Sequence, residues 1–226
     1  VGWLKVFRSE AGFADTALSR ELMDRHGVAY DILSPDEIRQ LEPALAKDFV
    51  RGLFHPGSAF ASTPKALVDS YTRYFLSHGG EIVTEQVQVV RPLNEGGVEI
   101  SAEHGLRRFD QVVVCAGAWS KTLTQQIGDK VILDTERGYH LNIEPGAAGE
   151  LRRPVCLPEE SFVMAPMADG LRLTSGEELA GIDAPADFSR IRKLLPRAQA
   201  ALPGLSGTAA GGDHGRVKPA RPAGGL

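Results

Sequence analysis

The sequence predicts a mixed fold of the α/β or α+β class, on three observations. Helical and strand patterns alternate along the 226 residues, which is not typical of a helical bundle or a β-sandwich. An unbroken apolar run at residues 112–115 is rich in β-branched side chains, which predicts a strand buried on both faces. The short strands expected before and after this run favour a second sheet of mixed or antiparallel order.

The first elements follow from hydrophobic periodicity. Residues 1–7 alternate like a strand, and apolar residues then recur at three- and four-residue spacing over 9–26, which predicts a helix that Gly27 ends. A short strand is expected at 30–33. Residues 51–61 mix Gly, His, Pro and aromatic side chains, so we interpret them as a loop.

A second helix begins at Ser34, because a capping box joins that residue to Glu37 and Pro35 fits the first turn. This helix ends before Pro43, since the residue preceding a proline avoids the helical region.

Glycine and proline residues mark the expected boundaries of the remaining helices and strands. Further helices are expected at residues 63–78, 120–127 and 188–202, the last kinked or split at Pro196. Further strands are expected at residues 82–83, 87–90, 98–100, 106–109, 112–115, 131–134, 139–143, 162–165 and 171–175. Residues 206–226 are rich in Gly, Ala and Pro and are expected to be irregular.

Composition excludes several classes of protein. The 25 basic and 29 acidic side chains give a formal charge of −4, and 42% of the residues are hydrophobic, which excludes general nucleic-acid binding and wholesale disorder. No apolar stretch is long enough to span a bilayer. Cys115 and Cys156 lie in apolar runs, and we interpret them as buried thiols of a reducing compartment.

The first candidate site follows the apolar run. A buried strand that ends in Ala116-Gly117-Ala118 leaves backbone uncovered at the carboxyl edge of a sheet, where open α/β folds bind nucleotides. Gly117 has no Cβ, so a ligand could approach closely. A core strand followed by an ordinary tight turn explains the same residues.

The second candidate site is Glu136-Arg137-Gly138-Tyr139-His140. A guanidinium can clamp a carboxylate with two hydrogen bonds, and a tyrosine can donate another. Strict alternation places Arg137 and Tyr139 on one face of the strand and His140 on the other. The alternative is a surface arginine paired with Glu136 beside a half-buried tyrosine. The sequence contains no HxH, HExxH or CxxC spacing, so a metal site is not expected. The absence of GxSxG and GxxxxGK[ST] argues against an α/β-hydrolase and a P-loop nucleotidase, and no GxGxxG motif is present.

Several segments, taken together and in order, resemble one family. The segments are residues 33–45 with Leu41-Glu42-Pro43, 60–75 with Thr63-Pro64, 80–90, 112–120, 137–140, 170–181 and 195–205. They are similar to the FAD-dependent amino-acid oxidoreductases, which include D-amino-acid dehydrogenase, D-amino-acid oxidase, glycine oxidase and sarcosine oxidase.

The resemblance implies a partial FAD-binding Rossmann-like domain and a substrate domain with a mixed or antiparallel sheet. Residues 1–60 and 129–205 would form the substrate domain, 61–128 the middle of the FAD-binding domain, and 206–226 the start of its final segment. FAD is the implied cofactor. Its contacts would be Val87, Ala116, Gly117 and Trp119, and the substrate-positioning residues would be Arg137, Tyr139 and His140.

The implied reaction oxidises the C–N bond of a D-amino acid by hydride transfer to FAD. The imino acid then hydrolyses to a 2-oxo acid, and quinone or oxygen accepts the electrons. A secondary-amine oxidase of the sarcosine or glycine type, and a truncated non-catalytic binding subunit, remain alternatives. We expect a cytoplasmic protein, with peripheral attachment to the inner membrane left open for the full-length protein.

Two departures from the family pattern suggest a piece of a longer protein. The family opens with a GxGxxG strand that is absent here, and the tail matches its final flavin segment only loosely, with Lys218 in place of an expected arginine. We therefore expect this chain alone to bind FAD weakly or not at all.

Overall fold

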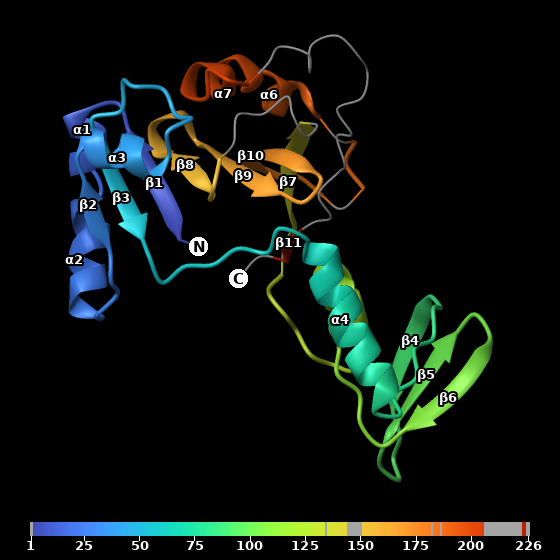
Figure 1. Cartoon of the computed structure of the whole chain (residues 1–226). Helices are drawn as coiled ribbons and strands as arrows, with labels where there is room; N and C mark the ends of the chain where they lie inside the picture. Colours follow the sequence, from blue (N-terminus) through green and yellow to red (C-terminus); the bar gives the residue numbers. More distant parts are fainter. Residues whose placement is uncertain are drawn as a thin grey trace. The chain divides into compact units, whose positions relative to one another are not determined.

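The computed structural model describes residues 2–133, 135–143, 151–181, 183–185, 187–205 and 223–224 (Figure 1). The chain divides into two compact units. Unit 1 comprises Val1–Leu67, Gly138–Glu177 and Ala186–Pro219, and unit 2 comprises Val68–Arg137, Glu178–Pro185 and Ala220–Leu226. Helices alternate with a large mixed sheet and a small antiparallel one, which confirms the predicted mixed α/β fold.

The large sheet has the strand order β11-β7-β10-β9-β8-β1-β3-β2. Its strands are β1 (Trp3–Phe7), β2 (Asp31–Leu33), β3 (Arg51–His55), β7 (Thr135–Ile143), β8 (Val155–Leu157), β9 (Phe162–Met167), β10 (Gly170–Leu179) and the two-residue β11 (Ala223–Gly224). β1 runs parallel to β8 and antiparallel to β3, so the sheet is mixed. Most residues of this sheet belong to unit 1.

One face of this sheet carries the core of unit 1. Leu4 pairs with Val155, Val155 with Met164, and Met164 with Leu173, and all four side chains are fully buried. Directly paired residues point to the same face, so the four form one apolar row across the strands. Three helices contribute to the same core: α3 (Pro35–Leu41), α6 (Ser189–Arg192) and α7 (Leu195–Ala201).

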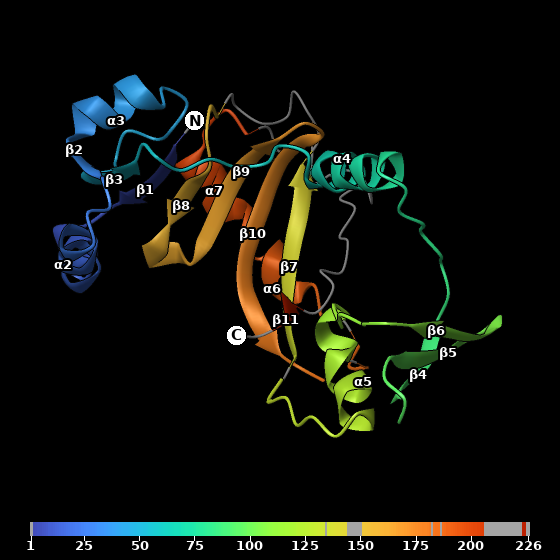
Figure 2. The ribbon, with the colours of Figure 1, turned by 90° about the horizontal axis from the view of Figure 1, so that it is seen from below.

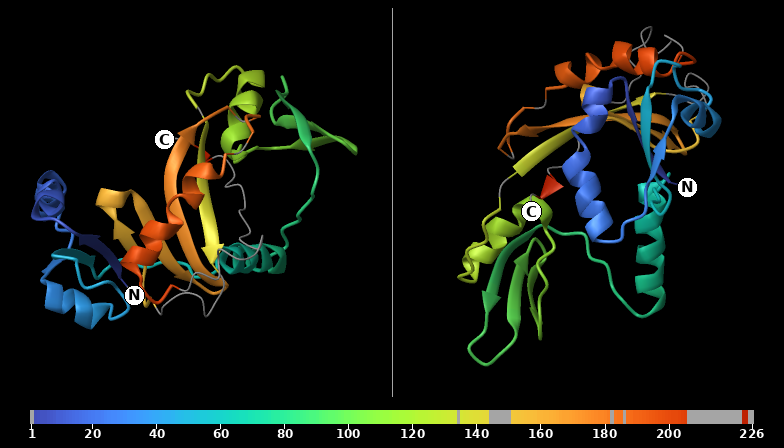
Figure 3. Two further views of the ribbon diagram at one scale, coloured as in Figure 1. Left: turned by 90° about the horizontal axis from the view of Figure 1, so that it is seen from above. Right: turned by 90° about the vertical axis from the view of Figure 1, so that its left-hand side faces the viewer.

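Opposite views show where the last two helices lie. Seen from above, α6 and α7 cross in front of the strands, and seen from below they lie behind β10 (Figures 2 and 3). Ile191 of α6 and Ala198 of α7 are buried against the strands. These helices therefore cover one face of the sheet.

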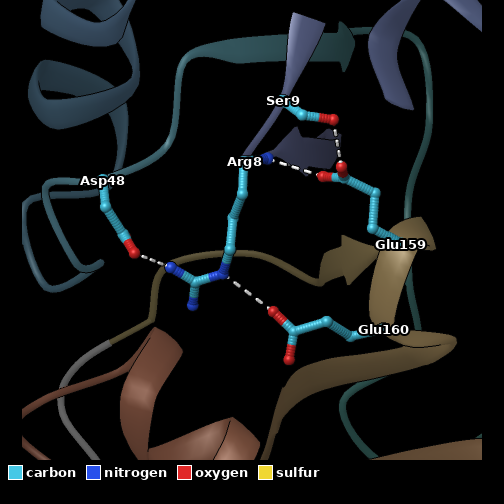
Figure 4. A network of polar contacts seen from close by, with 5 residues as sticks. All are labelled: Arg8, Ser9, Asp48, Glu159 and Glu160. Atoms are coloured by element: carbon cyan, nitrogen blue, oxygen red, sulfur yellow. Dashed lines mark hydrogen bonds and ion pairs between the residues drawn. The ribbon is translucent and has the colours of Figure 1, made fainter. Parts of the chain in front are cut away.

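A polar network fixes the carboxyl end of β1 (Figure 4). The backbone N–H of Arg8 donates to Glu159 at 2.6 Å, and the Ser9 hydroxyl donates to the same carboxylate at 2.5 Å. The Arg8 guanidinium pairs with Glu160 at 2.8 Å and with Asp48. The network therefore joins β1 to the turn that follows β8 and to the segment that precedes β3.

Unit 2 is built on an antiparallel meander of β4 (Val87–Pro92), β5 (Val98–Ala102) and β6 (Gly105–Phe109). The short turn η1 (Gly117–Trp119) leads directly into α5 (Ser120–Gln126). The Gln126 side chain accepts from the backbone N–H of Val90 at 2.9 Å and donates to the carbonyl of Gln88 at 3.0 Å. These two bonds attach α5 to β4.

Most predicted helices and several predicted strands are confirmed. The capping box at Ser34 and Glu37 is formed, α4 occupies Pro64–Ser77, and the helix expected at 188–202 splits into α6 and α7 with Pro196 in the first turn of α7. The single helix expected at 9–26 is instead α1 (Glu10–Ala14) and α2 (Ala17–Arg25). β8 was not predicted.

The loop expected at 51–61 is wrong for its first five residues, which form β3 between β1 and β2. Gly52 favoured the interpretation as a loop, because glycine is uncommon inside a strand. A Cβ at that position would lie 3.0 Å from Cγ1 of Ile38, so the glycine lets α3 pack closely against the strand.

The buried strand expected at 112–115 is also wrong. The segment belongs to neither sheet, and Val113 is 83% exposed. A strand buried on both faces needs neighbouring strands and a cover on each side, and the described part of unit 2 supplies neither. Cys115 is exposed for the same reason, so its predicted burial is wrong as well.

Three smaller expectations complete the comparison. Residues 82–83 and 131–133 are not in strands, and Asp134 lies outside the described residues. Ala223 and Gly224 form β11 within the tail that was expected to be irregular. The rest of the tail, including Lys218, lies outside the described residues.

Candidate functional site

The first predicted site lies at the turn before α5 in unit 2. Gly117 has φ +55°, a left-handed conformation that side chains rarely adopt, and a Cβ built there would meet nothing within 4 Å. The backbone N–H of Trp119 donates to the carbonyl of Ala116 at 3.1 Å and closes the turn. The structure therefore presents bare, accessible backbone at the glycine that the sequence singled out.

Val87 belongs to the same unit. It is the first residue of β4 and pairs with Ala102, next to an irregularity in the strand register between Val87 and Val89. α5 directly follows the turn at Gly117, and its last residue, Gln126, is hydrogen-bonded to β4. The helix is therefore attached both to the turn and to the strand that begins at Val87. All four predicted FAD contacts, Val87, Ala116, Gly117 and Trp119, thus lie in unit 2.

These residues fit contact with an aromatic nucleotide cofactor. Trp119 is 52% exposed and Val87 is 38% exposed, so two apolar side chains are accessible in the unit that also holds the Gly117 turn. The turn requires glycine for its backbone conformation, which also removes the side chain that would keep a planar ring away.

The second predicted site lies on β7, where burial alternates strictly. Arg137, Tyr139, Leu141 and Ile143 are buried, and His140 points to the opposite face, as the predicted alternation required. Arg137 is the last residue of a segment of unit 2, whereas Tyr139 and His140 belong to unit 1. The structure thus separates the three predicted substrate-positioning residues by face and by unit.

Tyr139 and Arg137 make defined local contacts. The Tyr139 hydroxyl accepts from the backbone N–H of Asp187 at 3.0 Å, and its ring packs edge-on against Phe188 at 5.3 Å between centroids. The Arg137 guanidinium donates to the carbonyl of Gly181 at 3.4 Å. Asp187 in turn accepts from the backbone N–H of Ser189 at 2.8 Å, and this bond lowers the pKa of the Asp187 carboxyl.

His140 lies on the sheet face opposite the core, which we call the open face. Strand pairing from β3 to β10 and the alternation along β7 place the same-face neighbours. The open face includes Trp3, Lys5, Phe7, Arg51, Leu53, His55, Cys156, Val163, Ala165, Arg172, Thr174, Glu136, His140 and Asn142. Phe7 and Leu53 on this face are fully buried, and most of the other side chains are partly buried.

Sequence reasoning did not single out Lys5, Asn142 or Arg172. Each lies in a segment where polar and apolar residues alternate, and that alternation is the signal that a polar face exists. Which strands pair, and in which register, decides that Lys5 and Arg172 share a face. Strand order is not readable from periodicity, so this grouping required the structure.

Two kinds of feature are absent from the part of the chain that the structure describes. No group of three or more His, Cys, Asp or Glu side chains is arranged to hold a metal ion. No helix of the described chain is both long and apolar enough to cross a membrane.

Comparison with known proteins gives the family. A sequence model of the family described as "FAD dependent oxidoreductase" (DAO) matches residues 1–222. The chain is 32% identical over 193 residues to a D-amino-acid oxidase of Bradyrhizobium diazoefficiens, which covers 85% of this chain and 45% of the relative. It is 25% identical over 227 residues to a D-amino acid dehydrogenase of Paramagnetospirillum magneticum, which covers 96% of this chain and 51% of that protein.

Solved structures agree on the fold. Glycine oxidase from Bacillus cereus superposes with a TM-score of 0.78 at 17% identity, over all of this chain and 59% of that one. Glycine oxidase from Geobacillus kaustophilus gives the same TM-score at 18% identity, over 99% of this chain and 58% of that one. The chain thus spans about half the length of the curated relatives it matches. With its family model matched from residue 1 to residue 222, the chain belongs to the FAD-dependent oxidoreductases of the DAO family.

Proposed function

We propose that the protein carrying this chain oxidises the C–N bond of a D-amino acid with FAD, giving an imino acid that water converts to a 2-oxo acid. The observation that carries the proposal is the 32% identity to a D-amino-acid oxidase, which extends over 85% of this chain. FAD, when bound, supplies the two-electron oxidising chemistry, and the protein supplies binding and orientation.

We assign cofactor contact to unit 2. Residues 61–128 would belong to the FAD-binding part of the protein, with Val87, Ala116, Gly117 and Trp119 as contacts. The support is geometric: the backbone at Gly117 is accessible, and the exposed Trp119 and Val87 offer apolar surface for an aromatic ring. Gly117→Val tests this assignment, because a branched side chain both strains the turn and occupies the space above it.

We assign substrate positioning to β7 within residues 129–205. His140 is the member of the predicted trio that lies on the open face, away from the core that Tyr139 joins. Arg137 and Tyr139 would act indirectly, by holding the strand through Gly181 and Asp187. His140→Gln is therefore expected to raise KM for the amino acid several-fold, with a smaller effect on stability than a change at Tyr139.

The experiment is anaerobic reduction of the flavin in the FAD-loaded protein that contains residues 1–226. Addition of D-alanine is expected to bleach the visible flavin band, and L-alanine is expected to leave it unchanged. Gly117→Val should lower FAD affinity, whereas Gly96→Val, in the exposed turn between β4 and β5, serves as the matched glycine control. Absence of bleaching by every amino acid tried, in a protein that holds FAD, would overturn the proposal.

A secondary-amine substrate is the second candidate. Proteins named glycine oxidase and iminodiacetate oxidase superpose on the whole chain with TM-scores of 0.78 and 0.70. Sarcosine added in the same experiment separates the two, because a secondary-amine oxidase bleaches with sarcosine and not with D-alanine. Oxygen uptake compared with reduction of a quinone then identifies the electron acceptor.

The free thiols Cys115 and Cys156 fit a cytoplasmic location, which we include in the proposal.

A further inference from the structure

A groove follows the outer edge of the large sheet in unit 1. β2 is an end strand of that sheet, and within the described chain no strand pairs with its outer edge. Residues 28–33 line the groove together with Asp24 of α2 and Glu37 of α3. An unpaired edge presents a row of backbone N–H and C=O groups, and an added strand can pair with these groups.

The helices α2 and α3 lie on opposite sides of this edge. Seen from below and from above, β2 and β3 lie between the two helices (Figures 2 and 3). A Cβ at Gly52 would lie 3.1 Å from Cβ of Leu33 and 3.0 Å from Cγ1 of Ile38, so Leu33 points to the side of α3. Because side chains alternate along a strand, Asp31 shares that side and Ile32 points to the other. A strand added here would place alternate side chains beside α3 and beside α2.

The groove is acidic. Asp24, Asp31 and Glu37 make no ion pair in the part of the chain that the structure describes, and no Lys or Arg is among the residues that line the groove. Hydrogen bonds from the Ser34 side chain and backbone lower the pKa of the Glu37 carboxyl, which keeps it ionised. Partial burial and a hydrogen bond to Asp24 raise the pKa of the Tyr30 hydroxyl, so Tyr30 stays a neutral donor. Three carboxylate charges therefore remain in one groove.

The arginines of the adjoining helices are engaged elsewhere. Arg25 and Arg39 each pair with a carboxylate of their own helix. Arg20 lies over the Phe13 ring, with 4.4 Å between the guanidinium carbon and the ring centre. A ligand that neutralises the groove must therefore bring its own positive charge.

Apolar side chains lie at the same edge. Val28 and Ile32 both line the groove and are exposed. A side chain opposite Ile32 gains most if it is apolar, because directly opposed residues pack against each other. On the side of α3, a Lys or Arg can pack its stem on Leu33 and bring its charge to Asp31. The edge thus suits a segment in which basic and apolar residues alternate.

A second copy of this chain does not suit the edge. Pairing of β2 with β2 of another copy would bring the same three carboxylates of both copies into one groove. Like charges that face each other across paired strands are destabilising. The charge of the groove therefore favours a different, basic partner.

We propose that the groove beside β2 binds an extended segment of another protein, in which Lys or Arg alternates with apolar residues, as an added strand of the large sheet. Backbone hydrogen bonds to β2 supply affinity, and the three carboxylates select the basic segment. The proposal stands on the groove alone and does not depend on the proposed function.

Fluorescence anisotropy of labelled peptides tests the proposal on the protein that contains residues 1–226. The probe is a peptide of about eight residues, a usual strand length, in which lysine alternates with valine. One comparison peptide carries glutamate in place of lysine. Another is N-methylated at its central residues, which removes N–H groups on both edges of the added strand. We expect Kd for both comparison peptides to be higher by about tenfold or more, because one reverses the charge and the other removes backbone hydrogen bonds.

Substitutions locate the binding in the groove. Asp24→Asn and Asp31→Asn are each expected to raise Kd for the lysine peptide by about two- to fivefold, the range for an exposed ion pair. Glu21→Gln removes an exposed carboxylate of α2 that does not line the groove, and it should leave Kd nearly unchanged. All three changes are at exposed positions, so the variants are expected to fold.

Each outcome decides the proposal. No binding of the lysine peptide overturns it, and so does equal affinity for the lysine and glutamate peptides or for the N-methylated peptide. Binding that survives Asp24→Asn and Asp31→Asn together also overturns it, because the charge that binds the peptide then lies elsewhere. Sedimentation of the protein as a dimer that the lysine peptide dissociates would assign the edge to a second copy instead.

Discussion

Glu42 shows how a single buried charge is accommodated in unit 1. Its side chain is fully buried, and it accepts from Nε of Arg153 at 2.7 Å and from the backbone N–H of Arg152 at 3.1 Å. The Arg153 guanidinium also lies 5.4 Å from the centre of the Phe54 ring. Both carboxylate oxygens are thus bonded, which is the condition under which a buried carboxylate is tolerated. Glu42 thereby joins the end of α3 to the segment before β8.

Tyr139 is the residue at which a structural role and a substrate role can be separated. Tyr139→Phe removes the acceptor of the Asp187 N–H while keeping the ring against Phe188. We expect a loss of about 1 kcal/mol in the free energy of unfolding, as for a buried hydrogen bond, with KM nearly unchanged. Urea unfolding of the variant measures the loss, and Tyr71→Phe, which is 68% exposed, is the control. A raised KM at unchanged stability would instead assign Tyr139 to the substrate.

At the scale of elements, the beginning of α3 offers the clearest prediction. The hydroxyl and the backbone N–H of Ser34 donate to the Glu37 carboxylate at 2.6 and 2.7 Å, and the Glu37 N–H donates back at 3.4 Å. Ser34→Ala removes the side-chain half of this box and is expected to lower the free energy of unfolding by about 1 kcal/mol. The midpoint of urea unfolding reports the loss.

The pH dependence of the same box has a definite sign. Hydrogen bonds from the Ser34 side chain and backbone lower the pKa of the Glu37 carboxyl in the folded chain. The stabilisation is therefore complete above the unfolded-state pKa and is lost as the pH falls through the folded-state pKa. Wild type and Glu37→Gln should differ in unfolding midpoint at neutral pH and converge in acid. Glu21→Gln, on exposed α2, controls for the loss of one surface charge.

Local signals predicted the elements that depend on local chemistry. The capping box at Ser34, the glycine stop after α4 and the split at Pro196 each act within a few residues, so the sequence pattern was sufficient. β3 was missed because its burial comes from β1, β2 and α3, which are distant in the sequence. The apolar run at 112–115 was misjudged for the converse reason, since its sequence describes a buried strand whose neighbours are not present in the described chain.

In the candidate site, too, local sequence predicted some residues and missed those that only the strand order brings together. Gly117 was found because a positive φ needs glycine, and the alternation of Tyr139 and His140 was found because strands have a period of two. Lys5, Asn142 and Arg172 were missed because only the order of β1, β8, β9, β10 and β7 brings them to one face.

At the scale of the whole molecule, the two units differ in their interiors. All members of the main hydrophobic core lie in unit 1, including fully buried residues of β1, β8, β9 and β10. Within the described part of unit 2, the buried hydrophobic residues are Val90 and Ala118. Apolar burial is the main source of stability, so unit 2 should be much the weaker of the two.

The chain carries a natural probe for each unit, because its two tryptophans are Trp3 in unit 1 and Trp119 in unit 2. We expect Trp3→Phe, which leaves the unit 2 probe, to show fluorescence changes at low urea. Trp119→Phe, which leaves the unit 1 probe, should change at higher urea, and circular dichroism of the unchanged chain should then show two steps rather than one. In the Trp119→Phe background, Ser34→Ala should lower the urea midpoint of the unit 1 transition. In the Trp3→Phe background, Ser34→Ala should leave the urea midpoint of the unit 2 transition unchanged, because α3 packs in the core of unit 1. Coincident transitions from both single-tryptophan variants would show that the units unfold together, and that the small interior of unit 2 is not what limits its stability.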